Sequence, residues 1–341
     1  SSGTEYTTIN VSSLSKNLPA VMSIVNEMLT QPRFDEDAFK RAVMSQKSSI
    51  KNAKTSITTL GQRAALKLWF GESTYSSFPT EESIDAITMD DVKAYFKTIT
   101  PKNTCIDVAG DIDAKSIKKA LAALEGWSGE EVAVPEPVFG KSAAAGNYFI
   151  DFPGSKQSYI YIIGPGRKIT EPAYSKLEVL NEKLGAGSNG LLFDVLRLQR
   201  GYTYGAYSSL RASDNYGYFM AASSVQGSAT KESVALFKEI FTDFGPNYTE
   251  ETLGKVKASL LRSNSSAFET PQSLVGMLQS IRLYGLPDDY VAVQEQIIEG
   301  TTLDDIKTLA KEHLNTNNMI FVVVGVAASQ MKNVPGAIRY E

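Results

Sequence analysis

Apolar residues recur every three or four positions along much of this chain, which is the spacing of an amphipathic helix. In the first third of the sequence this pattern predicts helices over residues 17–29, 34–50, 60–70, 88–97 and 116–124. A short apolar run at residues 104–109 predicts one strand between the last two of these helices. The first third is therefore expected to be mostly helical.

The pattern changes after residue 146, where short apolar runs alternate with helical spacing. These runs predict strands over residues 147–152, 157–163, 204–210 and 216–222. The last two strands form a hairpin across Ser213-Asp214-Asn215, because these residue types favour turns. Helices are predicted over residues 172–184 and 191–198, and Pro172 suits the first turn of the former.

The two parts of the chain also resemble each other. Phe70-Gly71 recurs as Tyr284-Gly285, an offset of 214 residues (284 − 70). The same offset aligns residues 34–98 with their later counterparts without a gap, and Cys105 to Gly110 matches Ile320 to Gly325 with one residue inserted. Chance similarity between helices would lose register over such a length, so the sequence predicts a duplicated domain.

The repeat sets the expected domain organisation. Residues 1–128 form the rear part of one copy, residues 129–146 form a Pro- and Ala-rich linker, and residues 147–341 form a complete copy. The offset places about 65 residues of the first copy ahead of Ser1 (149 − 214), so we expect a piece of a longer protein. The predicted fold class is α+β, with tandem homologous domains. Each domain has an antiparallel-rich sheet packed on one face by several helices, and the first copy is incomplete.

Composition excludes several function classes. The 34 basic and 38 acidic residues give a formal net charge of −4 without a strongly basic segment, so a nucleic-acid surface is not expected. The longest apolar runs, such as residues 319–326, are strand-sized, and no membrane span is predicted. The first residues do not indicate the compartment, and an extracytoplasmic bacterial site such as the periplasm is only a working guess.

The chain has a single cysteine and a single histidine. Cys105 lies in an apolar run and is interpreted as a small buried residue, whereas His313 is placed at the surface near the end of a helix. One His and one Cys cannot form a usual zinc site, so no metal is expected in this chain.

The most informative candidate chemistry lies at residues 196–207. Arg197 ends a predicted helix, Gly201 marks a turn and Tyr204 begins a strand. A guanidinium with forked donors and a phenol hydroxyl could together hold a peptide carbonyl and stabilise the oxyanion formed when it is attacked. The same residues also suit an ordinary helix–strand corner with a surface Arg and a half-buried Tyr, and the sequence alone leaves both interpretations open.

An ordered set of motifs around this corner resembles the pitrilysin/insulinase-type (inverzincin) metallopeptidases. The family's Gly-rich loop, Leu-Phe, Leu-Arg and Gly-Leu-x-Tyr features appear here as Gly185-Ala186-Gly187-Ser188, Leu192-Phe193, Leu196-Arg197 and Gly201-Tyr202-Thr203-Tyr204. The ending of the first repeat, from Thr88-Met89-Asp90-Asp91-Val92 to Val108-Ala109-Gly110-Asp111, also resembles the family's helix–strand ending. The resemblance covers nearly the whole chain, and the ordered set is more specific than any single motif.

The resemblance implies how the chemistry is divided. Active members of the family carry a zinc-binding His-x-x-Glu-His motif in one domain, and a homologous domain supplies an Arg and a Tyr that reach the substrate. By this resemblance Arg197 and Tyr204 are the catalytic pair. The expected substrate-binding residues are Gly185, Gly187, Ser188, Gly201 and Tyr202.

The chain departs from the family's catalytic pattern in both copies. It contains no His-x-x-Glu-His, and residues 174–177 read Tyr-Ser-Lys-Leu where a catalytic copy has this motif. Residues 42–49, in the helix that would carry the third zinc ligand, contain no carboxylate. Zinc is therefore expected in a homologous domain upstream or in a partner subunit, and this chain alone should not hydrolyse peptides.

Three hypotheses follow from the sequence. In the leading one, the chain is the non-zinc, substrate-binding and transition-state-completing half of a zinc endopeptidase that binds unfolded peptides in extended form. The alternative is a catalytically retired structural or peptide-binding subunit, as in the family's relatives in respiratory complexes. The third is an unrelated helical binding module, which would leave the repeat unexplained.

Overall fold

The computed structural model describes residues 1–266 and 268–340, which divide into two compact units. Unit 1 contains Ser1–Asn52, Phe78–Glu136 and Thr270–Leu278, and unit 2 contains Ala53–Ser77, Pro137–Glu269 and Gln279–Glu341. Each unit thus takes segments from both halves of the sequence. The boundaries predicted at residues 128 and 147 concern the repeat and stay a prediction.

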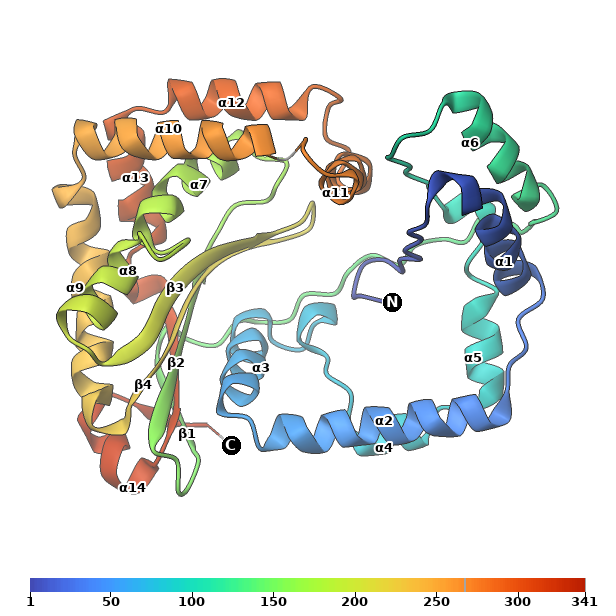
Figure 1. The fold of residues 1–341 in the computed structure, drawn as a ribbon. Helices are drawn as coiled ribbons and strands as arrows, with labels where there is room; N and C mark the ends of the chain where they lie inside the picture. Colours follow the sequence, from blue (N-terminus) through green and yellow to red (C-terminus); the bar gives the residue numbers. More distant parts are fainter. Residues whose placement is uncertain (267, 341) are drawn as a thin grey trace. The chain divides into compact units, whose positions relative to one another are not determined.

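Unit 2 is built on a six-stranded sheet with the strand order β3-β4-β2-β5-β1-β6 (Figure 1). The strands are β1 Gly146–Asp151, β2 Gln157–Pro165, β3 Thr203–Ala212, β4 Gly217–Gln226, β5 Ile320–Gly325 and β6 Ile338–Arg339. The β3–β4, β4–β2 and β2–β5 pairs are antiparallel, whereas β1 runs parallel to β5 and β6. This mostly antiparallel sheet with packed helices confirms the predicted α+β class.

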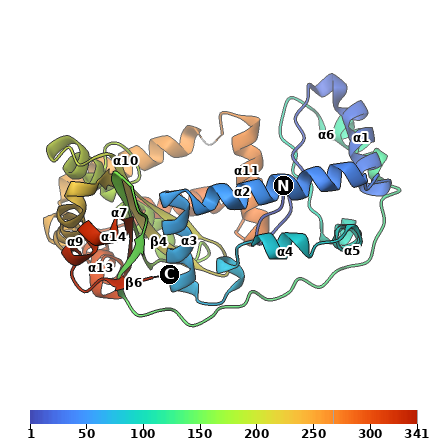
Figure 2. The ribbon, with the colours of Figure 1, turned by 90° about the horizontal axis from the view of Figure 1, so that it is seen from below.

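Helices cover both faces of the sheet (Figure 2). One face carries most of the helices of unit 2, which are α7 Pro172–Leu184, α8 Leu191–Phe193, α9 Thr230–Asn247, α10 Glu250–Ser266, α12 Tyr290–Gly300, α13 Leu303–His313 and α14 Ala327–Gln330. The other face is covered by α3 Ile57–Phe70, which packs on β2 and β5. Because both faces are covered, β2 is buried from Ser158 to Gly164 instead of alternating.

Small residues let α3 approach the sheet closely. Ala64 and Ala65 are buried against it, and a Cβ atom at Gly61 would lie 2.7 Å from Cδ1 of Tyr159. Since no side chain at Gly61 intervenes, the aromatic and branched residues of β2 and β5 pack directly on the helix. The sequence predicted several helices on one face of the sheet, and the structure adds α3 on the other face. The local sequence pattern does not show this second layer of helix.

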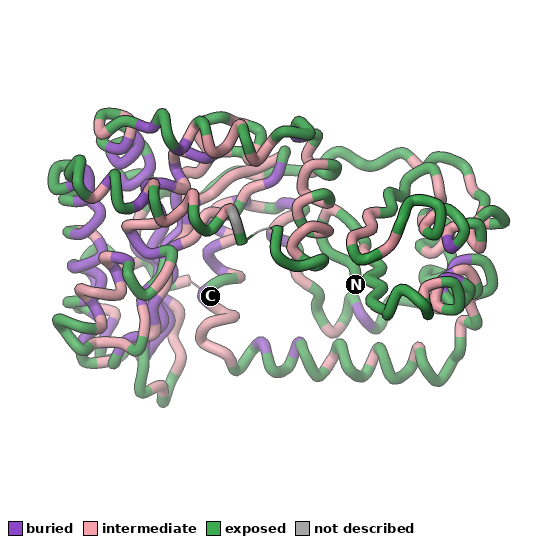
Figure 3. The backbone as a smooth tube through the Cα atoms, turned by 45° about the horizontal axis from the view of Figure 1, so that its top comes forward, coloured by how far each residue is buried: buried purple, intermediate pink, exposed green. Residues whose placement is uncertain are grey.

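The regular secondary structure of unit 1 is helical, and long segments without regular structure connect its helices. Its helices are α1 Leu18–Thr30, most of α2 Glu36–Lys54, α4 Glu81–Asp85, α5 Met89–Phe96, α6 Ala114–Leu121 and the first part of α11 Pro271–Leu283. Its small core is formed by Met22, Val25 and Leu29 of α1 with Ala120 of α6. Figure 3 shows buried residues gathered in unit 2, whereas most of unit 1 is exposed or intermediate. Within residues 1–266 and 268–340, no helix is both long and apolar enough to cross a membrane.

The two copies of the repeat share local structure at corresponding positions. Thr88 and Asp91 form a capping box at the start of α5, and Thr302 and Asp305 form the same box at the start of α13. Gly71 after α3 has φ 63°, and its counterpart Gly285 after α11 has φ 59°. Only glycine takes this conformation readily, so the same helix end is specified twice.

The predicted strand at residues 104–109 is wrong for this structure, and so is the predicted burial of Cys105. Residues 104–109 have no strand assignment and Cys105 is exposed, whereas its counterpart Ile320 in β5 is 1% exposed. A strand requires a neighbour to receive its backbone hydrogen bonds, and β5 obtains these from β2 and β1. No described residue of unit 1 takes the place of these two strands.

The surface position predicted for His313 is also wrong, since its exposed fraction is 3%. One ring nitrogen, Nδ1, lies 2.9 Å from the carbonyl oxygen of Pro165, and Nε2 accepts a hydrogen bond of 3.2 Å from Arg167. Burial and the Arg167 guanidinium lower the pKa of His313. The ring is therefore a neutral bridge between α13 and the end of β2.

Candidate functional site

Arg197 lies on a helical turn of unusual geometry. Asp194–Gln199, which follows α8, is a π-helix, and the N–H of Arg200 donates to the carbonyl oxygen of Val195 at 3.1 Å. Gly201 then reverses the chain with φ 67° before β3 begins. Isolated π-helical turns are rare and occur often at functional sites, because the extra residue redirects a side chain. Here it directs Arg197 toward the first residues of β3.

Tyr204 lies in a β-bulge at the start of β3. Thr203 pairs with Val225 and Ala206 pairs with Ser223. Between these two pairs β3 advances by three residues and β4 by only two, so β3 contains one extra residue. A bulge leaves a residue unpaired and bends the strand, which changes the direction of its side chain. The Tyr204 side chain is 84% exposed as a result. The sequence analysis did not predict this bulge, although Gly205 directly after Tyr204 could have indicated it, because glycine inside a strand often marks a bulge.

The hydroxyl of Thr203 holds the bulge together. It lies 2.6 Å from the carbonyl oxygen of Ser224 and 2.9 Å from that of Gly205, and it accepts from the Gly205 N–H at 3.0 Å. The Ser223 hydroxyl lies 3.0 Å from the Thr203 hydroxyl oxygen and 2.9 Å from the Gly205 carbonyl oxygen, and it donates to one of these two acceptors. One Thr side chain therefore satisfies backbone groups that the bulge removes from the ladder.

Replacing Thr203 with Val should lower the free energy of unfolding by about 1–3 kcal/mol, because the Gly205 N–H loses its acceptor. Amide hydrogen exchange at Gly205 should accelerate as well. Urea unfolding and hydrogen exchange measure the two effects, and Thr203→Ser, which keeps the hydroxyl, is the matched control. Equal stability and exchange in Thr203→Val and the unaltered chain would show that the hydroxyl does not hold the bulge.

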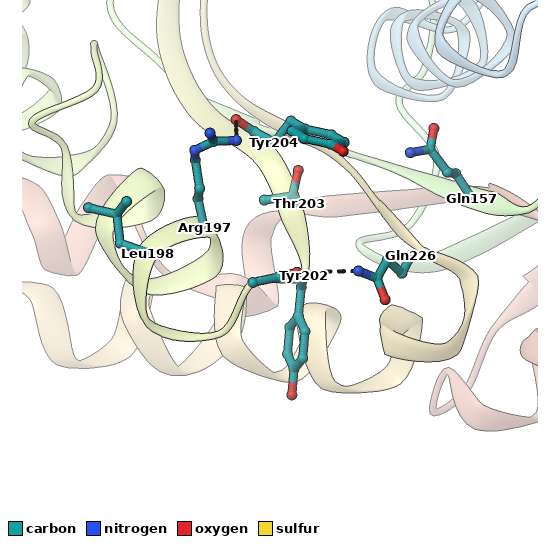
Figure 4. Close-up of a pocket in the computed structure, with 8 residues that line it drawn as sticks. Gln157, Arg197, Leu198, Tyr202, Thr203, Tyr204 and Gln226 are labelled. Carbon is teal, nitrogen blue, oxygen red and sulfur yellow. Dashed lines mark hydrogen bonds between the residues drawn. The ribbon is translucent and has the colours of Figure 1, made fainter.

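The structure brings Arg197 and Tyr204 together (Figure 4). An Nη1 hydrogen of Arg197 is donated to the backbone carbonyl oxygen of Tyr204 at 2.7 Å. The Cζ atom of Arg197 also lies 5.5 Å from the Tyr204 ring centroid and 5.4 Å from that of Phe193. Cation–π contacts on two rings and one charge-assisted hydrogen bond orient the guanidinium. The phenol hydroxyl of Tyr204 has no hydrogen-bond partner among the described residues.

A pocket of about 390 Å³ opens beside this pair. Its lining consists of Gln157, Arg197, Leu198, Gly201, Tyr202, Thr203, Tyr204 and Gln226. The Gln226 amide donates to the carbonyl oxygen of Gly201 at 3.3 Å, which joins the turn to the end of β4. Gln157 and Gln226 pair across β2 and β4, and the sequence analysis did not select them because their nearness depends on strand register. The pocket thus presents amide and phenol groups and one cation.

The remaining predicted substrate-binding residues divide into two groups. Gly201 and Tyr202 line the pocket, although the Tyr202 ring points away from Arg197 and Tyr204 (Figure 4). Gly185, Gly187 and Ser188 are not among the lining residues. The Gly185 carbonyl accepts from the Ser208 N–H of β3 at 2.8 Å, and a Cβ atom at Gly185 would lie 2.6 Å from the Ser208 hydroxyl. Gly185 therefore allows the loop to cover the middle of β3, and the substrate-binding role of all five residues stays a prediction.

Helix α7 occupies the place where a catalytic copy would carry its zinc motif. Lys176 on this helix pairs with Asp305 at 2.8 Å, and the Tyr, Ser, Lys and Leu side chains at residues 174–177 are not a zinc-binding set. No group of three or more His, Cys, Asp or Glu side chains in the described part of the chain could hold a metal ion. The residues of this chain do not fit the family's zinc site.

Glu178 on the same helix should make stability depend on pH. Desolvation raises its pKa from 4.5 to about 7, although the Gln294 amide donates to it at 2.8 Å. A carboxyl group with a raised folded pKa loses stability as pH rises from its unfolded pKa through its folded pKa. We expect Glu178→Gln to be more stable than the unaltered chain at pH 8, by at most about 3 kcal/mol, with a much smaller difference at pH 4.5.

Urea unfolding at pH 4.5 and pH 8 measures this effect. Glu299→Gln, at an exposed position of α12, is the matched control and should show little pH-dependent change. A stability difference between Glu178→Gln and the unaltered chain that stays constant with pH would contradict the assignment.

Comparison with known proteins agrees with this geometry. A family model described as the peptidase M16 inactive domain matches residues 86–260. The non-peptidase homolog YmxG of Helicobacter pylori is 23% identical over 305 residues, which cover 88% of this chain and 70% of that protein. The uncharacterized zinc protease SCO5738 of Streptomyces coelicolor is 21% identical over 355 residues, which cover 98% of this chain and 75% of that protein.

A solved structure shows the same fold. The crystal structure of a peptidase M16 inactive domain from Pseudomonas fluorescens superposes with a TM-score of 0.81 at 22% identity, over 93% of this chain and 76% of that one. The family match spans more than half of the chain, and it agrees with a helix α7 that lacks zinc-binding side chains. The chain belongs to the peptidase M16 family, as a member of its inactive-domain class.

Proposed function

We propose that this chain is the non-zinc half of a zinc-dependent endopeptidase that acts on unfolded peptides. The observation that carries the proposal is the Arg197/Tyr204 pair, in which an exposed phenol and an anchored guanidinium meet in one pocket. Packing alone does not require this arrangement, because a phenol that is 84% exposed contributes little to a core. The pair is suited to a ligand that carries carbonyl oxygens.

In the proposed reaction each residue has a distinct role. The Tyr204 hydroxyl donates a hydrogen bond to the oxyanion that forms when the scissile carbonyl is attacked. Arg197 uses one N–H to hold the Tyr204 backbone, and its side chain is also part of the pocket lining. It thereby orients Tyr204 and adds a positive potential where negative charge develops. A homologous partner domain or subunit would supply zinc, which activates the attacking water.

The sheet edge supports binding of an extended peptide. β3 is the edge strand of the sheet, and an added strand could use its free backbone groups. The Ser208 N–H already pairs with Gly185, so the middle of this edge is occupied. The substrate would therefore contact the first residues of β3, around Tyr204 and Ala206, with the residue 185–188 loop at one end of its path.

A catalytically retired subunit is the second candidate. The name of the Helicobacter pylori relative, a non-peptidase homolog, favours it, and so does the inactive-domain family itself. In that case the Arg197/Tyr204 pocket would bind a peptide or a neighbouring subunit without chemistry.

Reconstitution distinguishes the two candidates. The chain would be mixed with a homologous protein that contains the His-x-x-Glu-His motif, and cleavage of a quenched fluorescent peptide would be followed with zinc present. Activity in the mixture, with none from either component alone, is expected for the split-site enzyme. A stable complex without activity favours the retired subunit, and cleavage by this chain alone would overturn the assignment of the metal to a partner.

A further inference from the structure

One face of the sheet in unit 2 is only partly covered. Helix α3 packs on β2 and β5, and Tyr161 of β2 belongs to the core between them. Tyr161 pairs with Ala222 of β4, which pairs in turn with Tyr207 of β3, so the three side chains lie on the same face. Tyr161 is 3% exposed and Tyr207 is 45% exposed. The β3 side of this face is therefore accessible.

The accessible side of this face carries positive charge and no negative charge. β2, β3 and β4 contain no Asp or Glu, and Arg211 of β3 is their only charged residue. Arg197 lies at the other end of β3. Neither arginine forms an ion pair with a carboxylate in the described part of the chain, whereas Arg167 and Arg339 of unit 2 do. In a chain with a net charge of −4, this strand pair is locally positive and attracts anionic groups.

Two glutamines bring neutral amide groups to the same pocket as Arg197. Gln157 and Gln226 lie opposite each other in the β2–β4 ladder, and both line the pocket. Gln226 is held by the Gly201 carbonyl oxygen, whereas the Gln157 amide forms no side-chain hydrogen bond with any described residue. The Tyr204 ring extends from β3 toward Gln157 (Figure 4). The Gln157 amide and the Tyr204 hydroxyl are thus available to a ligand.

The lining of this pocket contains no carboxylate. Asp194, the acidic residue nearest to Arg197 in sequence, accepts from the Gln199 amide at 2.9 Å and is not a lining residue. The positive charge of Arg197 is therefore not neutralised inside the pocket. A guanidinium, an amide and a phenol are all donors, and a carboxylate can accept several hydrogen bonds at once. A neutral carbonyl oxygen would leave the charge without a counter-ion.

We propose that this pocket binds a carboxylate of the peptide, so that the chain prefers peptides with an acidic side chain or a free C-terminus at this position. The inference rests on the proposed function, because it takes the ligand to be a peptide. Gln157 donates to the carboxylate and Arg197 supplies the opposite charge. Gln226 is a positioning residue, since it holds the turn at Gly201. The two sources of the carboxylate share this chemistry and differ only in where the group lies in the peptide.

The test measures binding of three labelled peptides to the full chain by fluorescence anisotropy. The peptides share one uncharged extended sequence. The first has a central Glu and an amidated C-terminus, the second has Gln in place of this Glu, and the third has the central Gln and a free C-terminus. We expect the first or the third to bind at least about tenfold more tightly than the second, because charge-assisted hydrogen bonds are the stronger ones. This preference should shrink as salt is added. The first peptide reports an acidic side chain and the third a terminal carboxylate.

Variants of Gln157 test whether the preference arises in this pocket. Gln157→Glu should remove the preference, because a second carboxylate repels the first, and Gln157→Lys should increase it. Neither change removes a side-chain hydrogen bond between described residues, so both variants should fold. Gln31→Glu is the matched control, since it adds the same charge at an exposed position of unit 1 and should keep the preference.

Three results would overturn the carboxylate site. They are equal affinity for the three peptides, a preference that Gln157→Glu and Gln157→Lys leave unchanged, and no binding of any peptide. The proposed function has a separate readout, which is cleavage in the reconstituted mixture. Cleavage without a carboxylate preference would reject only the carboxylate site, whereas a preference without cleavage would reject the split-site enzyme and keep the pocket as a peptide-binding site.

Discussion

Replacing Tyr204 with Phe is expected to lower the rate of peptide cleavage about a hundredfold in the reconstituted enzyme. The substitution removes one hydroxyl and keeps the ring that contacts Arg197. Loss of one preformed donor to an oxyanion costs about 3 kcal/mol of transition-state stabilisation, because the donor lies in place before charge develops. The measurement is kcat and KM on a quenched fluorescent peptide, and most of the loss should appear in kcat.

Tyr202→Phe is the matched control for this experiment. It removes the same atom two residues earlier in the chain, from a ring that points away from Arg197 and Tyr204 (Figure 4). Its activity should stay within about threefold of the unaltered enzyme, since it loses no donor at the proposed oxyanion position. Equal activities for Tyr204→Phe and Tyr202→Phe would show that the Tyr204 hydroxyl has no catalytic role, and the Arg197/Tyr204 pair would then only bind the peptide.

The second large effect is a difference in the loss of stability when equivalent positions of the two copies are substituted. Phe321→Ala should lower the free energy of unfolding of unit 2 by about 3–5 kcal/mol, because it creates a cavity at the centre of the core. Ile106→Ala, at the matching position of unit 1, should change the stability by less than about 0.5 kcal/mol. The exposed fractions of 0% and 47% are the reason for the contrast.

The two tryptophans allow each unit to be followed separately. Trp69 lies on α3 and packs on the core of unit 2, whereas Trp127 packs on the core of unit 1. Urea unfolding would be followed by fluorescence in a Trp127→Phe background for Phe321→Ala and in a Trp69→Phe background for Ile106→Ala. A loss of 2 kcal/mol or more in Ile106→Ala would mean that residues 105–110 are already packed in solution.

The sequence by itself determined the features that depend on neighbouring residues. The capping boxes at Thr88 and Thr302 follow from a hydroxyl and a carboxylate three residues apart, so helix starts could be predicted in both copies. The repeat could be predicted because one offset persists through several helices. The helix–strand corner with Arg197 and Tyr204 could also be predicted, since a glycine turn joins elements that are adjacent in sequence.

Only the tertiary structure decided the features that depend on distant partners. His313 is buried because Pro165 and Arg167 lie beside it, and Cys105 is exposed because no strand of unit 1 covers it. The direction of the Tyr204 side chain depends on a bulge whose register is set by β4. The hydrophobicity of a side chain indicates only its tendency to be buried. Strand pairing and packing between distant segments decide whether it is buried and where it points.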